Sequence, residues 1–304
     1  MTLDSELDAL AGWCVEVFGS APAETLFEQQ HLSRVVGYRL HDGQEVVLKL
    51  RPPDERVLAC LDVHAYVCSR GFPCPRPLAG PSFLGTMLVT AEAYIEPGNR
   101  FDGPEAPRKF AEVLHRLLVL TSGYQPRLPL EPPPPWLGGW SHPGPGIWPP
   151  ADDLPDDLNA IDTPWLDDVA RRVAVVLKAS RLPAIAGHAD WTATNVEWRN
   201  GELHVVHDWD SLAYLPEAAF AGGASVLFSQ TSTAAASLDE SRAFLEAYEA
   251  FRVEPWSAEE RSICWAAGLW NLAFDAKKDQ MRGGGASLER LQLEHDTRLR
   301  LAGV

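Results

Sequence analysis

Four polar residues of the kinds that support catalysis gather in "GHADWTATNVEWRNGELHVVHDWDS", residues 187–211: His188, Asp190, Asn195 and Asp208. Two runs of alternating polarity flank Asn200-Gly201, a pair typical of a tight β-hairpin turn. Because a hairpin brings its two ends side by side, we expect Asn195 and Asp208 to be neighbours. Asp190 lies on the loop that enters the same end. Carboxylate and amide oxygens suit Mg²⁺, so the stretch predicts a magnesium site.

The spacing of these residues is typical of phosphoryl transfer. His-x-Asp followed by four residues and Asn is the catalytic-loop pattern of kinases, in which Asp accepts the substrate hydroxyl proton and Asn binds metal. Asp208 stands in "HDWDS" where protein kinases have Asp-Phe-Gly. The following "SLAYLPEAAFAGG" contains no Ala-Pro-Glu, which favours a small molecule over a protein as the acceptor.

Along most of its length the chain resembles the aminoglycoside phosphotransferase and choline kinase superfamily of small-molecule kinases. The resemblance rests on Lys49 in "VVLKL", the helix before "GFPCPRPL", the "LHRLL" helix, "HADWTATN" and "HDWDS". It implies an α+β, protein-kinase-like bilobal fold, with a small N-terminal antiparallel-sheet lobe and a larger, mainly helical C-terminal lobe. Residues 1–92 would bind the nucleotide and residues 93–304 would bind the substrate and carry out catalysis, with ATP in the cleft between the lobes.

The resemblance also implies roles for individual residues. Lys49 would hold the α- and β-phosphates of ATP, and Asp190 would be the catalytic base. Asn195 and Asp208 would hold Mg²⁺, and Ser33 would lie in the loop over the phosphates. A hinge would offer backbone groups to adenine from Thr90, Ala91, Glu92, Ala93 and Tyr94. The implied reaction moves the γ-phosphate of MgATP to a hydroxyl group of a small molecule.

The chain departs from the family pattern at three places. Ala189 replaces the glycine of the usual His-Gly-Asp, so the loop is not expected to need a positive φ there. The phosphate loop, "QQHLSRVVG", has no run of glycines. The acid that pairs with Lys49 is left between Asp62, in the middle of the next helix, and Glu55, in its first turn.

Other segments have clear signals for secondary structure. Apolar spacing predicts a helix that ends at Gly19, and Asp42-Gly43 predicts a hairpin. Further helices are expected in "PPDERVLACLDVHAYVCSRG", "PEAPRKFAEVLHRLLVL", residues 164–180 and residues 238–304, and a buried strand in "TMLVTAEAYIEPGN". A Pro- and Trp-rich insertion at about residues 126–155 is expected to be extended and pinned to the body by Trp136, Trp140 and Trp148.

Composition limits the partners. The net charge is −16, which argues against a nucleic-acid partner and is compatible with a cationic ligand. Acids of the C-terminal half would suit an amine-bearing acceptor: Glu254, Asp275 and Asp279. The sequence has no apolar run long enough for a membrane span, an acidic N-terminus unlike a signal peptide, and five cysteines without a Cys-x-x-Cys pair. We therefore expect a cytoplasmic protein with no membrane partner; the oligomeric state is not encoded in any visible pattern.

Two alternatives from other classes stay open. A metal-dependent hydrolase could use His188, Asp190, His207 and Asp208, and would bind zinc or manganese without a nucleotide. A non-catalytic nucleotide-binding module with a kinase-like fold would bind ATP without turnover, and its binding would be insensitive to Asp190→Asn.

Overall fold

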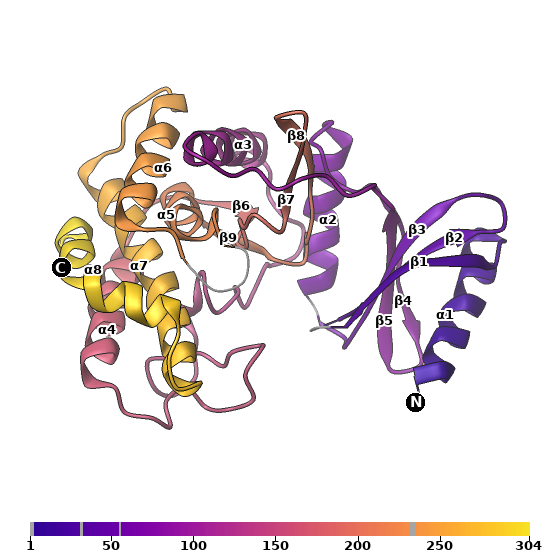
Figure 1. Cartoon of the computed structure of the whole chain (residues 1–304), viewed down its shortest axis with the longest axis horizontal. Coiled ribbons are helices and arrows are strands. Elements are labelled where there is room, and N and C mark those ends of the chain that lie inside the picture. The colour runs from indigo at the N-terminus through magenta and orange to yellow at the C-terminus, as the bar shows by residue number, and fades with distance from the viewer. Residues whose placement is uncertain (1–2, 31–32, 55, 231–234) are drawn as a thin grey trace. The chain divides into compact units, whose positions relative to one another are not determined.

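The computed structural model describes residues 3–30, 33–54, 56–230 and 235–304. The chain forms two compact units, Met1–Pro97 and Gly98–Val304 (Figure 1). Within the described ranges, no helix is long and apolar enough to cross a membrane.

The first unit is an antiparallel sheet with two helices. Five strands lie in the order β1-β2-β3-β5-β4. The elements are α1 (Leu3–Phe18), β1 (Pro22–Gln30), β2 (Arg34–Leu40), β3 (Glu45–Arg51), α2 (Arg56–Ser69), β4 (Pro77–Leu84) and β5 (Met87–Ala93). Strands β1 and β4 were not expected, because β1 is a largely exposed edge without an apolar alternation and β4 contains Gly80-Pro81. The α+β class and the antiparallel N-terminal sheet are confirmed.

Strand β3 has two faces with different environments. Val46, Leu48 and Leu50 are buried in a core that α1 completes with Leu10 and Trp13. Successive side chains of a strand alternate, so Lys49 points to the opposite face. It is nevertheless only 9% exposed, which a lysine tolerates when carboxylates lie nearby.

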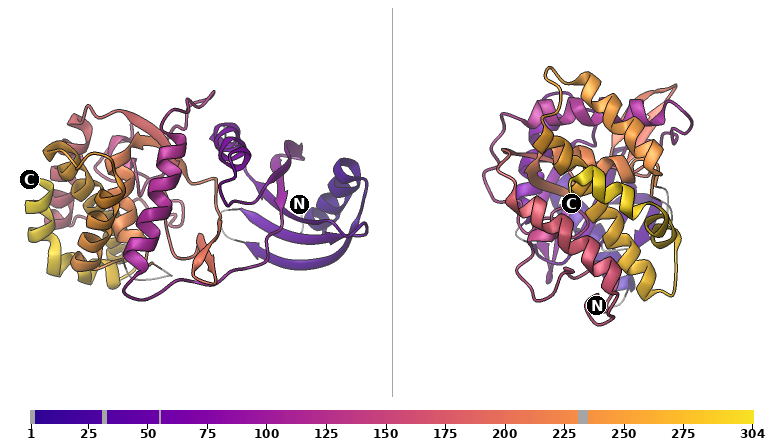
Figure 2. Two further views of the ribbon diagram at one scale, coloured as in Figure 1. Left: turned by 90° about the horizontal axis from the view of Figure 1, so that it is seen from above. Right: turned by 90° about the vertical axis from the view of Figure 1, so that its left-hand side faces the viewer.

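The second unit is mainly helical (Figure 2). Its two small sheets pair β6 with β9 and β7 with β8. The elements are α3 (Ala106–Thr121), the 3₁₀ turn η1 (Gly139–Ser141), α4 (Pro164–Ala179), β6 (Ala184–His188), β7 (Val196–Arg199), β8 (Glu202–Val206), β9 (Leu212–Pro216), α5 (Glu217–Leu227), α6 (Leu238–Phe251), α7 (Ala258–Met281) and α8 (Ala286–Ala302).

Helices α5 and α7 pack unusually closely. A Cβ atom added at Gly222 of α5 would lie 2.0 Å from the carbonyl oxygen of Cys264 on α7. One added at Gly268 would lie 2.8 Å from the carbonyl oxygen of Gly222. Helix α5 directly follows β9, and β9 pairs with β6, which ends at His188. The close packing of α5 on α7 therefore supports the strand pair from which the loop with Asp190 begins.

The Pro- and Trp-rich segment is pinned to the body by tryptophans, as the sequence predicted. Trp140 and Trp148 are buried and pack on Trp270 of α7, with ring centroids 6.0 and 5.8 Å away. Nε1 of Trp148 donates to Oδ1 of Asp167 over 2.7 Å. The fully buried Lys277 reaches the same carboxylate oxygen at 3.1 Å.

Candidate functional site

The predicted hairpin places two of the candidate ligands at one end. Val196 of β7 pairs with Val206 of β8, and the His207 amide donates to the Asn195 carbonyl over 2.8 Å. Asn200 and Gly201 have φ values of 54° and 78°, as this tight turn requires. Asn195 and the chain that leads into Asp208 therefore lie side by side.

His188 holds the loop rather than acting as a base. Its Nδ1 accepts from the Asp190 amide over 3.2 Å, and its Nε2 lies 2.9 Å from the His207 carbonyl oxygen. These partners require the proton on Nε2 and a neutral ring. The ring meets Trp191 and Trp209 edge to face, with centroids 5.8 and 5.6 Å away. Both nitrogens are thus used to join the loop to the end of the hairpin.

Asp190 and Asn195 are in direct contact. Nδ2 of Asn195 donates to Oδ2 of Asp190 over 2.7 Å and to its backbone carbonyl over 3.0 Å. Burial and, to a smaller extent, the negative charge of Asp208 raise the pKa of Asp190 to about 7, although the hydrogen bond from Asn195 acts in the opposite direction. A carboxyl whose pKa lies near neutrality suits a general base.

Asp208 is held in a backbone conformation that few side chains adopt. Its φ is 61°, in the left-handed region, where strain often marks a functional residue. Ser211, which the sequence did not single out, donates from Oγ to Oδ2 of Asp208 over 2.6 Å. The backbone conformation and the bond from Ser211 together fix the direction of this carboxylate.

The residues present fit a magnesium ion. The amide nitrogen of Asn195 is used by Asp190, so its oxygen is the atom able to bind a cation. The carboxylates of Asp190 and Asp208 repel each other, as the raised pKa of Asp190 shows, and a divalent cation would relieve this repulsion. Oxygen donors of this kind are the preferred ligands of Mg²⁺.

The hydrolase alternative is not favoured by this geometry. His188 has both ring nitrogens in contact with backbone groups, and Nε2 of His207 faces Oε2 of Glu197 at 3.8 Å. No cluster of three or more His, Cys, Asp or Glu side chains able to hold a metal occurs within the described residues.

Lys49 has a carboxylate neighbour that the sequence did not identify. Its Nζ lies 3.5 Å from Oε2 of Glu92, which was expected only to offer backbone groups. Lys49 pairs directly with Thr90 across β3 and β5, so Glu92 is its diagonal neighbour on the same face. The contact follows from the register of β5 against β3, which cannot be derived from the sequence pattern. Asp62 lies on α2, and Glu55 lies outside the described residues.

The expected hinge residues are mostly part of the sheet. Thr90, Ala91, Glu92 and Ala93 belong to β5, between β3 and β4, and Tyr94 follows it. The amide of Ala93 donates to the Arg76 carbonyl over 2.9 Å, and that of Tyr94 to the Glu45 carbonyl over 3.2 Å. These two amides thus donate within the N-terminal unit, and the assignment of backbone groups of Thr90–Tyr94 to adenine stays a prediction. Ser33 immediately precedes β2; the neighbouring residues 31 and 32 are not described.

A charged cluster on α7 lies near Asp190. Nζ of Lys278 lies 3.0 Å from Oδ1 of Asp275 and 3.4 Å from Oδ2 of Asp153, which belongs to the Pro- and Trp-rich segment. Arg282 adds a second cation 3.0 Å from Asp153. Asp275 raises the pKa of Asp190 and Lys278 lowers it, so the charges of these two side chains reach the proposed base.

Of the three acids expected to attract an amine, Asp275 is the one whose charge acts on the pKa of Asp190. Asp279 accepts the amides of Ser287 and Leu288 over 2.9 and 3.2 Å, at the start of α8, which is a structural role. Glu254 is exposed in the connection between α6 and α7.

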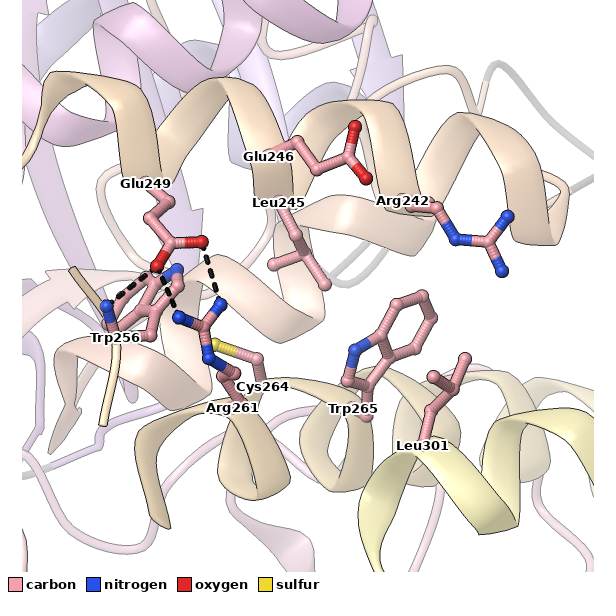
Figure 3. A pocket seen from close by; sticks show the side chains of 9 residues that line it. All are labelled: Arg242, Leu245, Glu246, Glu249, Trp256, Arg261, Cys264, Trp265 and Leu301. Carbon is pink, nitrogen blue, oxygen red and sulfur yellow. Dashed lines mark hydrogen bonds and ion pairs between the residues drawn. The ribbon is translucent and has the colours of Figure 1, made fainter. Parts of the chain in front are cut away.

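A separate hollow of about 190 Å³ lies between α6, α7 and α8 (Figure 3). Glu249 accepts from the Trp256 amide and from Arg261, each over 2.8 Å, which joins α6 to the start of α7. The hollow is lined by Arg242, Leu245, Glu246, Glu249, Trp256, Arg261, Cys264, Trp265 and Leu301. None of the candidate site residues lines it, so it is distinct from the Asp190 cluster.

Comparison with known families decides the identity. The family model described as "Phosphotransferase enzyme family" matches residues 27–254 of the chain. The chain belongs to this phosphotransferase family. The resemblance predicted from its motifs is confirmed, and the protein is an enzyme, a small-molecule kinase. No curated protein matches the sequence of this phosphotransferase.

Solved structures share the fold of this phosphotransferase at low sequence identity. An amicoumacin kinase in complex with AMP-PNP and Ca²⁺ has a TM-score of 0.64 and 12% identity, covering 99% of this chain and 96% of that one. An aminoglycoside phosphotransferase with ADP and hygromycin B has a TM-score of 0.61 and 12% identity, covering 97% and 99%. The macrolide 2'-phosphotransferase of Brachybacterium faecium has a TM-score of 0.53 and 19% identity, covering 93% and 96%.

Proposed function

We propose that this phosphotransferase moves the γ-phosphate of MgATP to a hydroxyl group of a small, amine-bearing molecule. The observation that carries the proposal is the meeting of Asp190, Asn195 and Asp208 at one end of the β7–β8 hairpin. Two of the solved structures support a nucleotide donor, because they contain AMP-PNP or ADP together with a small molecule.

In this proposal, Asp190 orients the acceptor hydroxyl and takes its proton as the phosphoryl group transfers. Phosphoryl transfer needs mainly positioning and positive charge, because the transition state carries its charge on the phosphoryl oxygens. The hydrogen bond from Asn195 keeps the Asp190 carboxylate in one direction. The pKa of about 7 leaves a large fraction of the carboxyl ionised at neutral pH.

Asn195 and Asp208 are the residues that would hold Mg²⁺. A bound Mg²⁺ would supply positive charge against the phosphate oxygens. Lys49 would contact the α- and β-phosphates, and Glu92 or Asp62 would orient its ammonium group. We propose Ser33 for the phosphate loop and backbone groups around Thr90–Tyr94 for adenine. Residues 1–92 would serve the nucleotide, and residues 93–304 would serve catalysis and the acceptor.

Support for an amine-bearing acceptor comes from charge. Asp275 acts on the Asp190 carboxyl and has a second acid, Asp153, on the far side of Lys278. An ammonium group of the acceptor would share these carboxylates with Lys278. The relatives bind hygromycin B and spectinomycin in the same general fold. Because the donor is ATP, we also propose that the enzyme works in the cytoplasm.

The experiment is MgATP consumption by the purified protein with a panel of hygromycin B, spectinomycin, amicoumacin, amino sugars, choline and homoserine, beside Asp190→Asn. Turnover stimulated by one compound and lost in the variant supports the proposal and names the acceptor class. ATP binding without turnover, equal in both proteins, would instead favour the non-catalytic nucleotide-binding module. Turnover that persists in Asp190→Asn would exclude Asp190 as the base.

A further inference from the structure

The peptide group between Ala189 and Asp190 is held by side chains at both ends. Its N–H, from Asp190, donates to Nδ1 of His188 over 3.2 Å. Its carbonyl, from Ala189, accepts from Nε1 of Trp136 over 3.1 Å. A peptide group is planar and rotates as a unit, so these two bonds together fix the plane from which the Asp190 side chain projects.

The side chain that accepts from this peptide group and the side chain that donates to it come from different parts of the chain. His188 belongs to the loop itself, whereas Trp136 belongs to the Pro- and Trp-rich segment, 53 residues before Ala189. The Ala189 amide donates to the Ser211 carbonyl over 2.7 Å, and the residue is 1% exposed. Ala189 is therefore almost completely shielded from water, and Trp136 supplies a hydrogen-bond donor to its carbonyl.

Trp136 is itself held from both sides. Residues 132–135 are all proline, which restricts the backbone that leads to it. The Pro135 carbonyl accepts from Nε1 of Trp270 on α7 over 3.1 Å. Leu137 is 1% exposed, and a Cβ atom at Gly223 of α5 would lie 2.7 Å from its side chain. These contacts on either side of Trp136 restrain the backbone that positions its indole N–H against the Ala189 carbonyl.

We infer that Trp136 is a positioning residue for the general base, acting on Asp190 through the Ala189 carbonyl. The inference rests on the proposed function, in which Asp190 takes the proton of the acceptor. It assigns the Pro- and Trp-rich segment a part in catalysis that does not require contact with either substrate.

The test compares two tryptophans of the same segment. Trp136→Phe keeps an aromatic ring and removes the donor to Ala189. Trp148→Phe is the matched control, because it removes an indole donor to Asp167 on α4 and keeps the bond from Trp136 to Ala189. We expect Trp136→Phe to lower kcat roughly tenfold or more, with KM for ATP within about twofold of the parent, since a misdirected reacting group slows chemistry without weakening nucleotide binding. Trp148→Phe should lower the melting temperature and keep kcat.

Turnover is measured with the best acceptor of the panel, or with water as the acceptor of the γ-phosphate if no panel compound is phosphorylated. An unchanged kcat in folded Trp136→Phe overturns the inference. An equal loss of kcat in both variants that follows their melting temperatures also overturns it, because the role would then be structural. Persistent turnover in Asp190→Asn would instead count against the proposed function.

Hydrogen exchange gives a readout that needs no turnover. Amide exchange across residues 187–195 is compared in the parent and both full-length variants. Faster exchange in Trp136→Phe alone supports the inference, because the Ala189–Asp190 peptide has lost one of its two restraints. Unchanged exchange in that variant overturns it.

Discussion

The side-chain amide of Asn195 donates to the carboxylate of Asp190 over 2.7 Å. A residue assigned to metal binding therefore also orients the proposed base. Asn195→Ala removes both contributions, and we expect kcat to fall by about 10²-fold or more, as for other residues that position charge in an active site. Steady-state kinetics over a range of Mg²⁺ concentrations measure the loss. A fall in kcat that excess Mg²⁺ restores fully would show that Asn195 serves the metal and leaves Asp190 unaffected.

The 3.5 Å contact between Lys49 and Glu92 leads to a second prediction. In Glu92→Gln the ammonium group loses a charged neighbour, so its direction is less fixed and KM for ATP should rise about five- to tenfold. Asp62→Asn on α2 is the matched comparison, because it makes the same change of carboxylate to amide. A larger rise in Asp62→Asn would assign the pairing to α2. Calorimetric measurement of nucleotide binding to each variant shows whether Glu92 or Asp62 pairs with Lys49.

The ion pair between Asp153 and Lys278 predicts an effect on the acceptor. Asp153→Asn removes a charge that joins the Pro- and Trp-rich segment to α7, where Arg282 also binds it. We expect KM for the acceptor to rise about tenfold while KM for ATP stays the same, because a carboxylate that shares an acceptor ammonium is lost. Asp156→Asn, an exposed position three residues along, is the control. Equal effects of the two changes on acceptor KM would refute a specific role for Asp153.

The buried pair of Asp167 and Lys277 predicts a dependence of stability on pH. Burial alone would raise the pKa of Asp167, but hydrogen bonds from Trp148, Thr163 and Lys277 outweigh it and lower the pKa. A lowered pKa stabilises the fold above the pKa of the unfolded chain, and this contribution is lost as the pH falls through the folded value. Asp167→Asn should therefore cost about 3 kcal/mol of unfolding free energy at pH 7 and progressively less below about pH 4.

Urea unfolding at pH 7 and pH 3 measures how much unfolding free energy Asp167→Asn costs at each pH. Asp168→Asn is the matched control, because its carboxylate is half-exposed and pairs with Arg171 and Arg172 on the surface of α4. We expect it to change stability by less than about 1 kcal/mol at either pH. A cost for Asp167→Asn that is the same at pH 7 and pH 3 would contradict the assigned lowering of the pKa.

The sequence predicted the parts of the fold that have local signals. The Asn200-Gly201 turn and the alternation around it identified the hairpin, and the hairpin alone was enough to predict that Asn195 lies beside the chain that leads into Asp208. Strands β1 and β4 were missed, because an exposed edge and a Gly80-Pro81 pair carry no apolar alternation.

Three contacts of the site that the sequence did not predict are long-range. Glu92 reaches Lys49 through the register of β5 against β3, and Trp136 reaches Ala189 across 53 residues. Asp153 meets Lys278 only because the tryptophans of its segment pack on α7. Residue spacing encodes which side chains share a turn or a strand face, and it does not encode which distant segments meet.

The left-handed backbone of Asp208 has an evolutionary consequence. Apart from glycine, asparagine and aspartate are the residues that adopt this region most readily. Asparagine at position 208 would keep the turn and lose the negative charge, and a single-base codon change converts one residue into the other. If Asp208 serves phosphoryl transfer as proposed, such a descendant would lose the reaction and keep the local backbone turn.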